Sequence, residues 1–385
     1  MLENILMWRY PASGYSMLND DKHKLNSYWT SNIKKLLHAK SHTNTSLKLS
    51  VLESRFNYII QAAPDNLTVL SSGGIDSTYI AVLAQSLGKK INLINITYLD
   101  YDESDKVENL ANILGVKASY IHLTEDAIDN SFRNICKWMP APNERGSTIL
   151  SYFLYNTKAN LLIGDAFDCC FSPSMPETIA ASKKETISEQ EFNNLLYKLT
   201  PLEFKRITGK QPPRIKIDCK ECLQDPLTLA IFFDYISDTP YYYRLRYKNT
   251  NVTAPAQDLH IAEYSLSCKS LHQTSEKYYL RMIANKLFTQ QGLPKSDQLA
   301  ATPKGLMKIE PEMYSFLDKY IDPNYLPPNI NLTQVNKLPQ HKKAWTNLLL
   351  AITSQWLASR KITGEEYARQ LRHTKRKNTF NLLQL

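Results

Sequence analysis

The sequence predicts an α/β fold, in which a twisted parallel sheet carries helices on both faces and is followed by a mostly helical C-terminal part. Three observations lead to this prediction. Short apolar segments alternate with helical patterns between residues 66 and 163. A Gly-Gly turn joins the first apolar segment to the first helical pattern. From about residue 185 onward, the pattern is mostly helical.

The elements of the predicted sheet alternate along the chain. Strands are expected at 68–70, 91–99, 119–123 and 160–163. The segment 102–114 is expected to be a helix, because Gly115 behind it is a residue type that commonly ends helices. The gap before the fourth strand is long for a simple crossover, so an insertion or an extra helix is expected there.

The C-terminal part contains one especially clear helical pattern. Trp345, Leu349, Ile352 and Trp356 recur at helical spacing. The stretch 323–328 before them looks like a surface loop, because it begins and ends with proline. The basic tail at 369–377 is read either as a solvated helix end or as a contact for a carrier, a peptide leader or RNA.

The composition argues against several classes of protein. Of the 385 residues, 43% are hydrophobic and 22% are charged, so a large core can form. The first ten residues lack the basic and apolar regions of a signal peptide, and the apolar run 227–235 is too short to cross a membrane. Six cysteines do not make a disulfide framework in a chain of this size, so the cytoplasm is the expected compartment. The net charge of +9 suits an anionic substrate or a nucleic acid.

Between the first predicted strand and the following helix lies the string Ser72-Gly73-Gly74-Ile75-Asp76-Ser77. Gly73 and Gly74 let the backbone approach a bound anion, and the start of the helix offers free N–H groups and a partial positive charge. Ser72 and Ser77 add hydroxyl donors. Asp76 would repel a phosphate unless Mg²⁺ lies between them. The string therefore predicts a loop that binds phosphate together with Mg²⁺.

This string resembles the PP-loop, SGGxDS, of the ATP pyrophosphatases, and residues 72–77 are called the PP-loop below. From about residue 50 to 310, the chain is similar to the synthetase domain of the asparagine synthetase and β-lactam synthetase superfamily. Besides the PP-loop, three later stretches carry the resemblance in the expected order. They lie at 161–171, 252–258 and 277–306, similar to the family strings LSGDGADELFGG, RVPFLD and K..LR…LP…RPKxGF.

The resemblance implies a PP-loop (HUP-like) fold and an enzyme that uses ATP and Mg²⁺. Asp76 and Asp168 match the two carboxylates that hold the metal ion, and Gly164 lets the backbone approach the adenine. Lys277 matches the lysine that meets the pyrophosphate. Lys304 matches the lysine that stabilises charge during adenylation and amide formation. For both lysines, a solvated surface charge is the alternative.

Some positions depart from the family strings. Cys169 stands where the family has the acidic partner of Asp168, and the stretch 252–258 has lost the family's arginine. Asp165 occupies a position where some members carry a catalytic Glu or Tyr, so it is a candidate base for the incoming amine. These departures indicate a substrate other than aspartate.

Two domains are expected, an N-terminal remnant or cap at 1–60 and a synthetase domain at 61–385. Glutamine-dependent relatives begin with a domain whose N-terminal cysteine hydrolyses glutamine. Here residue 2 is Leu2, and 60 residues are too few for such a domain. The amine is therefore expected from solution, from a partner or from the substrate itself. Cys219 and Cys222 have the spacing of metal ligands, but the sequence has no second CxxC or CxxH pair to complete a metal site.

The function predicted from these features is an AMP- and pyrophosphate-forming amide ligase that adenylates a carboxylate. The expected substrate is a small molecule or a peptide, in the tailoring or ring closure of a specialised metabolite. A partner protein or peptide carrier is left open, and no membrane or nucleic acid is expected. The alternatives are a PP-loop enzyme that modifies tRNA, favoured by the positive charge, and a non-catalytic scaffold with the same fold.

Overall fold

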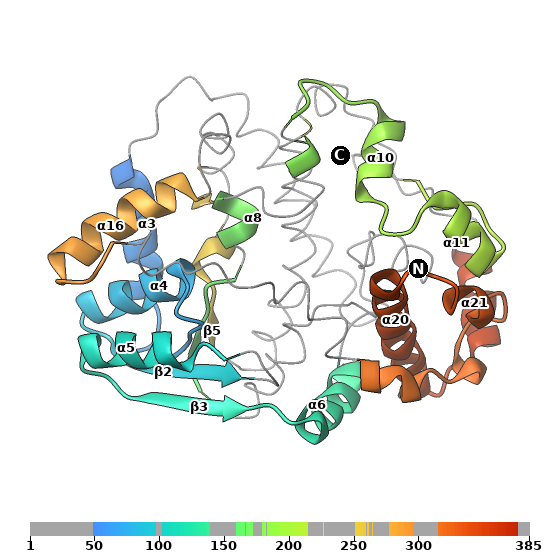
Figure 1. Cartoon of the computed structure of the whole chain (residues 1–385), viewed down its shortest axis with the longest axis horizontal. Coiled ribbons are helices and arrows are strands. Elements are labelled where there is room, and N and C mark those ends of the chain that lie inside the picture. Colours follow the sequence, from blue (N-terminus) through green and yellow to red (C-terminus); the bar gives the residue numbers. More distant parts are fainter. Residues whose placement is uncertain are drawn as a thin grey trace.

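The computed structural model describes most of the α/β part and of the C-terminal helices (Figure 1). The described residues are 49–97, 102–138, 159–165, 167–171, 179–181, 183–214, 226, 251–258, 260–261, 264, 277–295 and 315–375. All structural statements below concern these residues.

The described strands form one parallel sheet. Its members are β1 (Asn66–Leu70), β2 (Lys90–Thr97), β3 (Ala118–His122), β4 (Leu161–Leu162) and β5 (Val252–Thr253). Their order is β3-β2-β1-β4-β5, and each neighbouring pair is parallel. The α/β class and the four predicted strands are thereby confirmed. The short strand β5 was not predicted as a strand.

The strand order reverses beside β1. From β1 the chain moves outward through β2 to β3, and it then returns to add β4 and β5 on the other side. Such a reversal leaves a crevice beyond the carboxyl ends of the two central strands, here β1 and β4. The PP-loop follows β1 and Gly164 follows β4, so the topology places both at this crevice.

Two helices cover the sheet on one side (Figure 1). They are α4 (Ile75–Ser86), which contacts β1 and β2, and α5 (Ser104–Leu114), which contacts β2 and β3. Nine residues of α4 are buried, because α3 (Leu49–Gln61) and α16 (Tyr278–Gln290) cover it from outside. As predicted, α5 ends at Gly115, which has the left-handed conformation with φ of 64°.

An aromatic cluster joins α3 and α4 to α8 (Phe167–Phe171). The ring of Phe56 lies 5.6 Å from that of Phe167 in a stacked arrangement, and 5.3 Å from that of Tyr79 edge to face. All three side chains are buried, and such ring pairs stabilise beyond their buried area. The predicted domain boundary at residue 60 thus falls at the end of a helix that packs into this core. The cluster also anchors α8, which carries Asp168.

The C-terminal part is mostly helical, as predicted. Its described helices are α10 (Glu189–Leu196), α11 (Pro201–Thr208), α16, α19 (Leu332–Val335), α20 (Gln340–Ala358) and α21 (Gly364–Lys375), with the 3-10 turns η3 (Pro255–Gln257), η4 (Ser315–Tyr320) and η5 (Pro323–Tyr325). The helix α6 (Glu125–Trp138) comes earlier in the chain, between β3 and β4. Helix α20 contains the predicted tryptophans and packs against α6 and η4. The stretch 323–328 is only partly a surface loop, because it begins with η5 and buries Leu326 in the core. Within the described ranges, we find no helix of the length and apolarity that a membrane crossing requires.

Candidate functional site

The PP-loop has a backbone shape that only glycine allows at Gly73. Its φ is +69°, in the left-handed region that side chains disfavour. A Cβ atom added there would lie 2.5 Å from the Cβ atom of Lys106, which belongs to the first turn of α5. Conformation and space therefore both require glycine.

Gly73→Ala is expected to unfold the loop locally and to destabilise the protein by about 1–3 kcal/mol, the range for strained backbone positions. ATP binding should fall with it. Gly88→Ala is a matched control, because φ is also positive there but nothing lies within 4 Å of the added Cβ. Denaturant unfolding and calorimetric titration with ATP would compare the two variants. Equal effects would remove the steric argument for Gly73.

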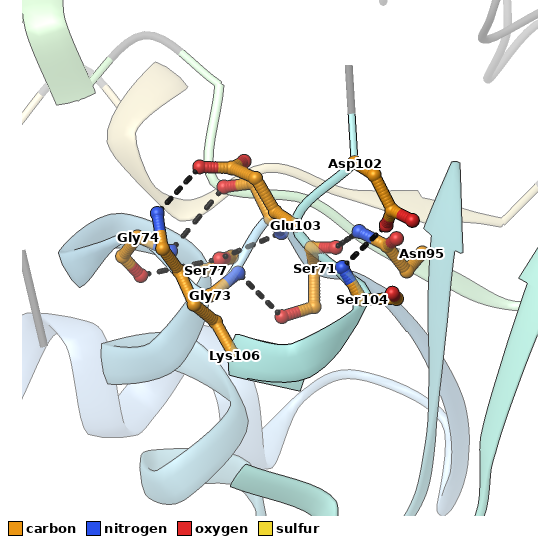
Figure 2. A network of polar contacts seen from close by, with 10 residues as sticks. Ser71, Gly73, Gly74, Ser77, Asn95, Asp102, Glu103, Ser104 and Lys106 are labelled. Carbon is orange, nitrogen blue, oxygen red and sulfur yellow. Dashed lines mark hydrogen bonds and ion pairs between the residues drawn. The ribbon is translucent and has the colours of Figure 1, made fainter. Parts of the chain in front are cut away.

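Three backbone N–H groups of the PP-loop donate long hydrogen bonds to serine hydroxyl groups (Figure 2). The N–H of Ser72 donates to Ser77 Oγ, that of Gly73 to Ser71 Oγ, and that of Gly74 to Ser72 Oγ, each at 3.3 Å. Typical N–H···O bonds are about 2.9–3.0 Å long, so these are weak and can be exchanged for stronger bonds to a phosphate. Within the described part of the chain, no side chain caps α4 at Gly74. The start of α4 is thus arranged to receive an anion.

Gly164 brings the end of β4 against the start of α4. A Cβ atom at this position would lie 3.1 Å from the Cβ atom of Asp76 and 3.2 Å from the N atom of Ser77. From the resemblance, Gly164 was expected to let the backbone approach an adenine. The structure gives it an additional role, because a larger residue would push apart the two segments that carry the candidate metal ligands.

Three charged side chains meet at the crevice between β1 and β4. The Nζ atom of Lys277 lies 2.6 Å from Asp76 Oδ2 and 2.5 Å from Asp168 Oδ1. The two oxygen atoms are therefore at most about 5 Å apart. Asp76 lies in the first turn of α4, Asp168 in α8, and Lys277 directly before α16. These positions are far apart in the sequence, and the fold brings together three residues that the resemblance singled out.

The backbone of Lys277 is strained. Its φ of 54° and ψ of 35° lie in the left-handed region, which costs a non-glycine residue roughly 1–2 kcal/mol. The residue is only 7% exposed. A long charged side chain held in this way is a frequent feature of functional sites. The alternative of a solvated surface charge is therefore wrong for Lys277.

The electrostatics of the cluster follow from burial and from mutual charge. Burial raises the pKa of Asp76 to about 6, although the charge of Lys277 opposes this rise, and the charge of Asp168 adds to it. For Lys277, burial acts to lower the pKa, but the two carboxylates outweigh it and raise the pKa. The ammonium group therefore stays charged at neutral pH and balances the two carboxylates.

The donor set fits a Mg²⁺ ion that is shared with a substrate. Asp76 Oδ1 is buried and has no hydrogen-bond partner among the described residues, although such atoms normally have one. Mg²⁺ commonly binds one or two carboxylates together with substrate phosphates, rather than a full set of protein ligands. No group of three or more His, Cys, Asp and Glu side chains that could hold a metal ion occurs among the described residues. Asp76 and Asp168 would hold the ion, which would neutralise the phosphates.

Sequence reasoning missed two residues beside the PP-loop, Glu103 and Lys106. Their side chains form an ion pair of 2.8 Å next to Gly73 and Gly74 (Figure 2). The helix that carries them was predicted correctly. The only signal for a site was their place at the start of the helix after β2, which parallel-sheet topology puts at the ligand-binding edge.

Several predicted positions remain untested. Asp165 lies three residues after the end of β4, at the same edge of the sheet, and it is half-buried. Its role as a base stays a prediction. Lys304, together with Cys219 and Cys222, lies outside the described residues. The basic tail begins within α21, which continues to Lys375.

One comparison with known proteins agrees with this site. Residues 63–166 match the model of the asparagine synthase family. The resemblance to the synthetase domain is thereby confirmed, and the match supports an ATP-dependent amide ligase. It covers the PP-loop and Gly164 but ends before Asp168 and Lys277. No curated protein matches the chain.

Proposed function

We propose, with the asparagine synthase match as the premise, that this chain activates a substrate carboxylate with ATP and joins it to an amine, releasing AMP and pyrophosphate. The observation that carries this proposal is the cluster of Asp76, Asp168 and Lys277 beside the PP-loop. Two carboxylates and a lysine at the start of a helix suit a magnesium–triphosphate group. The substrate class that we propose is a small molecule or a peptide, as in the tailoring or ring closure of a metabolite.

Each residue of the site has one task in this reaction. The N–H groups of the PP-loop bind the phosphates that leave as pyrophosphate. Asp76 and Asp168 bind Mg²⁺, which supplies positive charge to the phosphates when bound. Lys277 neutralises the pyrophosphate as it separates.

The carboxylate attacks the α-phosphorus, and an acyl-adenylate and pyrophosphate result. The amine then attacks the acyl carbon and AMP leaves. We propose that Asp165 accepts the proton of the amine, and that Lys304 stabilises the negative charge that develops in both steps.

Incubation of the full chain with Mg²⁺, α-labelled ATP and candidate carboxylates is expected to yield labelled AMP and an equal amount of pyrophosphate. Hydroxylamine, a strong nucleophile, would trap the acyl-adenylate and reveal the activated carboxylate without knowledge of the natural amine. Formation of ADP and phosphate would contradict the proposal. Activation that requires RNA instead of a carboxylate would support the tRNA-modifying alternative.

A further inference from the structure

The first turn of α5 lies directly on the PP-loop. The stem of Lys106 crosses Gly73 so closely that a Cβ atom added to Gly73 would lie 2.5 Å from Lys106 Cβ and 3.4 Å from Lys106 Cδ. Figure 2 shows the side chain running along the loop from α5 toward Gly74, so that its ammonium group lies beside the loop. The position of this cation is therefore set by contact with the loop itself.

The partner of this cation is largely covered by protein. Lys106 Nζ lies 2.8 Å from Glu103 Oε1, and the carboxylate side chain is 10% exposed while the lysine side chain is 32% exposed. A pair three residues apart on an open helix surface would contribute little to stability. Here the lysine stem is held against the loop, so the pair also keeps an ammonium group at the edge where an anion would bind.

The loop between β1 and α4 is flanked by cations from two sides. Lys277 approaches from the side of β4, where Asp76 and Asp168 already balance its charge. Lys106 approaches from the side of β2, the strand that α5 follows. A triphosphate or a pyrophosphate brings several negative charges, and a helix start supplies only about half a positive charge. A second lysine on the β2 side of the loop would supply part of the positive charge that the phosphates still require.

We propose that Lys106 is a phosphate-binding residue of this site, which contacts the nucleotide phosphates and the released pyrophosphate, and that Glu103 balances its charge while no phosphate is bound. The proposal rests on the function proposed above. It adds a contact on the β2 side of the loop, whereas Lys277 serves the β4 side. Phosphate oxygens then compete with Glu103 for the same ammonium group.

Lys106→Met is the informative variant, because methionine keeps an unbranched apolar stem over Gly73 and removes only the charge. Titration calorimetry with magnesium pyrophosphate is expected to show binding weakened by about tenfold to a hundredfold, as for one lost hydrogen bond to a charged group. Lys106→Arg should recover most of the affinity. Lys117 is exposed directly before β3, beyond the other end of α5, and Lys117→Met should bind like wild type.

Glu103→Gln is expected to change pyrophosphate binding in the opposite direction from Lys106→Met. The glutamine oxygen still accepts a hydrogen bond from Lys106, but its negative charge no longer repels the phosphate or competes with it. Pyrophosphate is therefore expected to bind several-fold more tightly to Glu103→Gln than to wild type. A pair that only braces the helix would instead lower the melting temperature in both variants and leave pyrophosphate binding unchanged.

The outcomes separate this inference from the proposed function. If wild type binds neither ATP nor pyrophosphate, the proposed function fails. If wild type binds pyrophosphate and Lys106→Met binds it equally well, only the role of Lys106 is overturned. Weaker binding by both Lys106→Met and Glu103→Gln, with no recovery by Lys106→Arg, would likewise overturn it, because the intact pair, and not the charge of Lys106, would then be what pyrophosphate binding requires.

Discussion

Asp76→Asn and Asp168→Asn are each expected to lower kcat for AMP formation by about a thousandfold or more, while the protein stays folded. Loss of either carboxylate removes one of the two groups that would hold Mg²⁺ against the phosphates, and such charge stabilisation amounts to several kcal/mol. At 1.36 kcal/mol per tenfold change in rate, about 4 kcal/mol corresponds to this loss. Both oxygens already lie within 2.6 Å of one ammonium group, so little rearrangement is needed for them to share one ion.

The double variant is expected to be little worse than either single variant, because the two side chains act on one metal ion. Asp65→Asn is the control. The carboxylate of Asp65 is 91% exposed and pairs with Lys89, and it lies at the end of β1 that is opposite to the PP-loop. Circular dichroism would verify folding, and release of labelled AMP would measure turnover. Near-normal turnover in either single variant would remove that residue from the metal site.

Lys277→Met is expected to lower both the activity and the stability of the protein. Turnover and pyrophosphate binding should fall by at least about a hundredfold, because a positive charge that stabilises the leaving group is lost. Without nucleotide, the variant should also unfold more easily, by about 2 kcal/mol. Two carboxylates then face each other without a cation, which costs less than in a fully buried site because Asp168 is half exposed.

The same variant is expected to bind Mg²⁺ or Mn²⁺ without nucleotide more tightly than wild type does. In wild type, the ammonium group of Lys277 lies where the ion would bind, and it must move away from at least one carboxylate. Divalent ions alone should therefore raise the melting temperature of Lys277→Met more than that of wild type. Lys286→Met is a control in α16, the helix that Lys277 precedes, because Lys286 is 61% exposed and pairs with Glu53. Equal responses of variant and wild type to the ions would contradict this competition.

The shape of the PP-loop was predictable because it depends on residues that are neighbours in the chain. A short apolar strand, two glycines and a helix start decide the path of residues 72–77, and Gly73 has the conformation that makes glycine necessary. The same holds for α5, whose end at Gly115 is a local event. The parallel sheet followed from the alternation of strands and helices, because parallel strands need crossovers.

The tertiary structure alone decided which distant residues meet. Helix α3 was assigned to an N-terminal cap, although Leu52, Phe56 and Ile60 recur at helical spacing and are buried against the α/β core. The strand β5 has only two residues and exists through its pairing with β4. Periodicity cannot reveal a strand of this length, because one alternation is not a pattern.

The candidate site shows the same division between local and long-range information. Sequence strings singled out Asp76, Asp168 and Lys277 one by one, but their contact within 2.6 Å depends on three elements that the aromatic cluster and the sheet hold together. Lys106 had no string to single it out. Its place on the PP-loop results from the packing of α5 beside α4, which involves residues more than thirty positions apart. The sequence by itself determined the shape of the PP-loop and the fold class, because both depend on the residue pattern of short segments. Only the folded chain decided how the charges around that loop are balanced, because charge balance depends on distances in space.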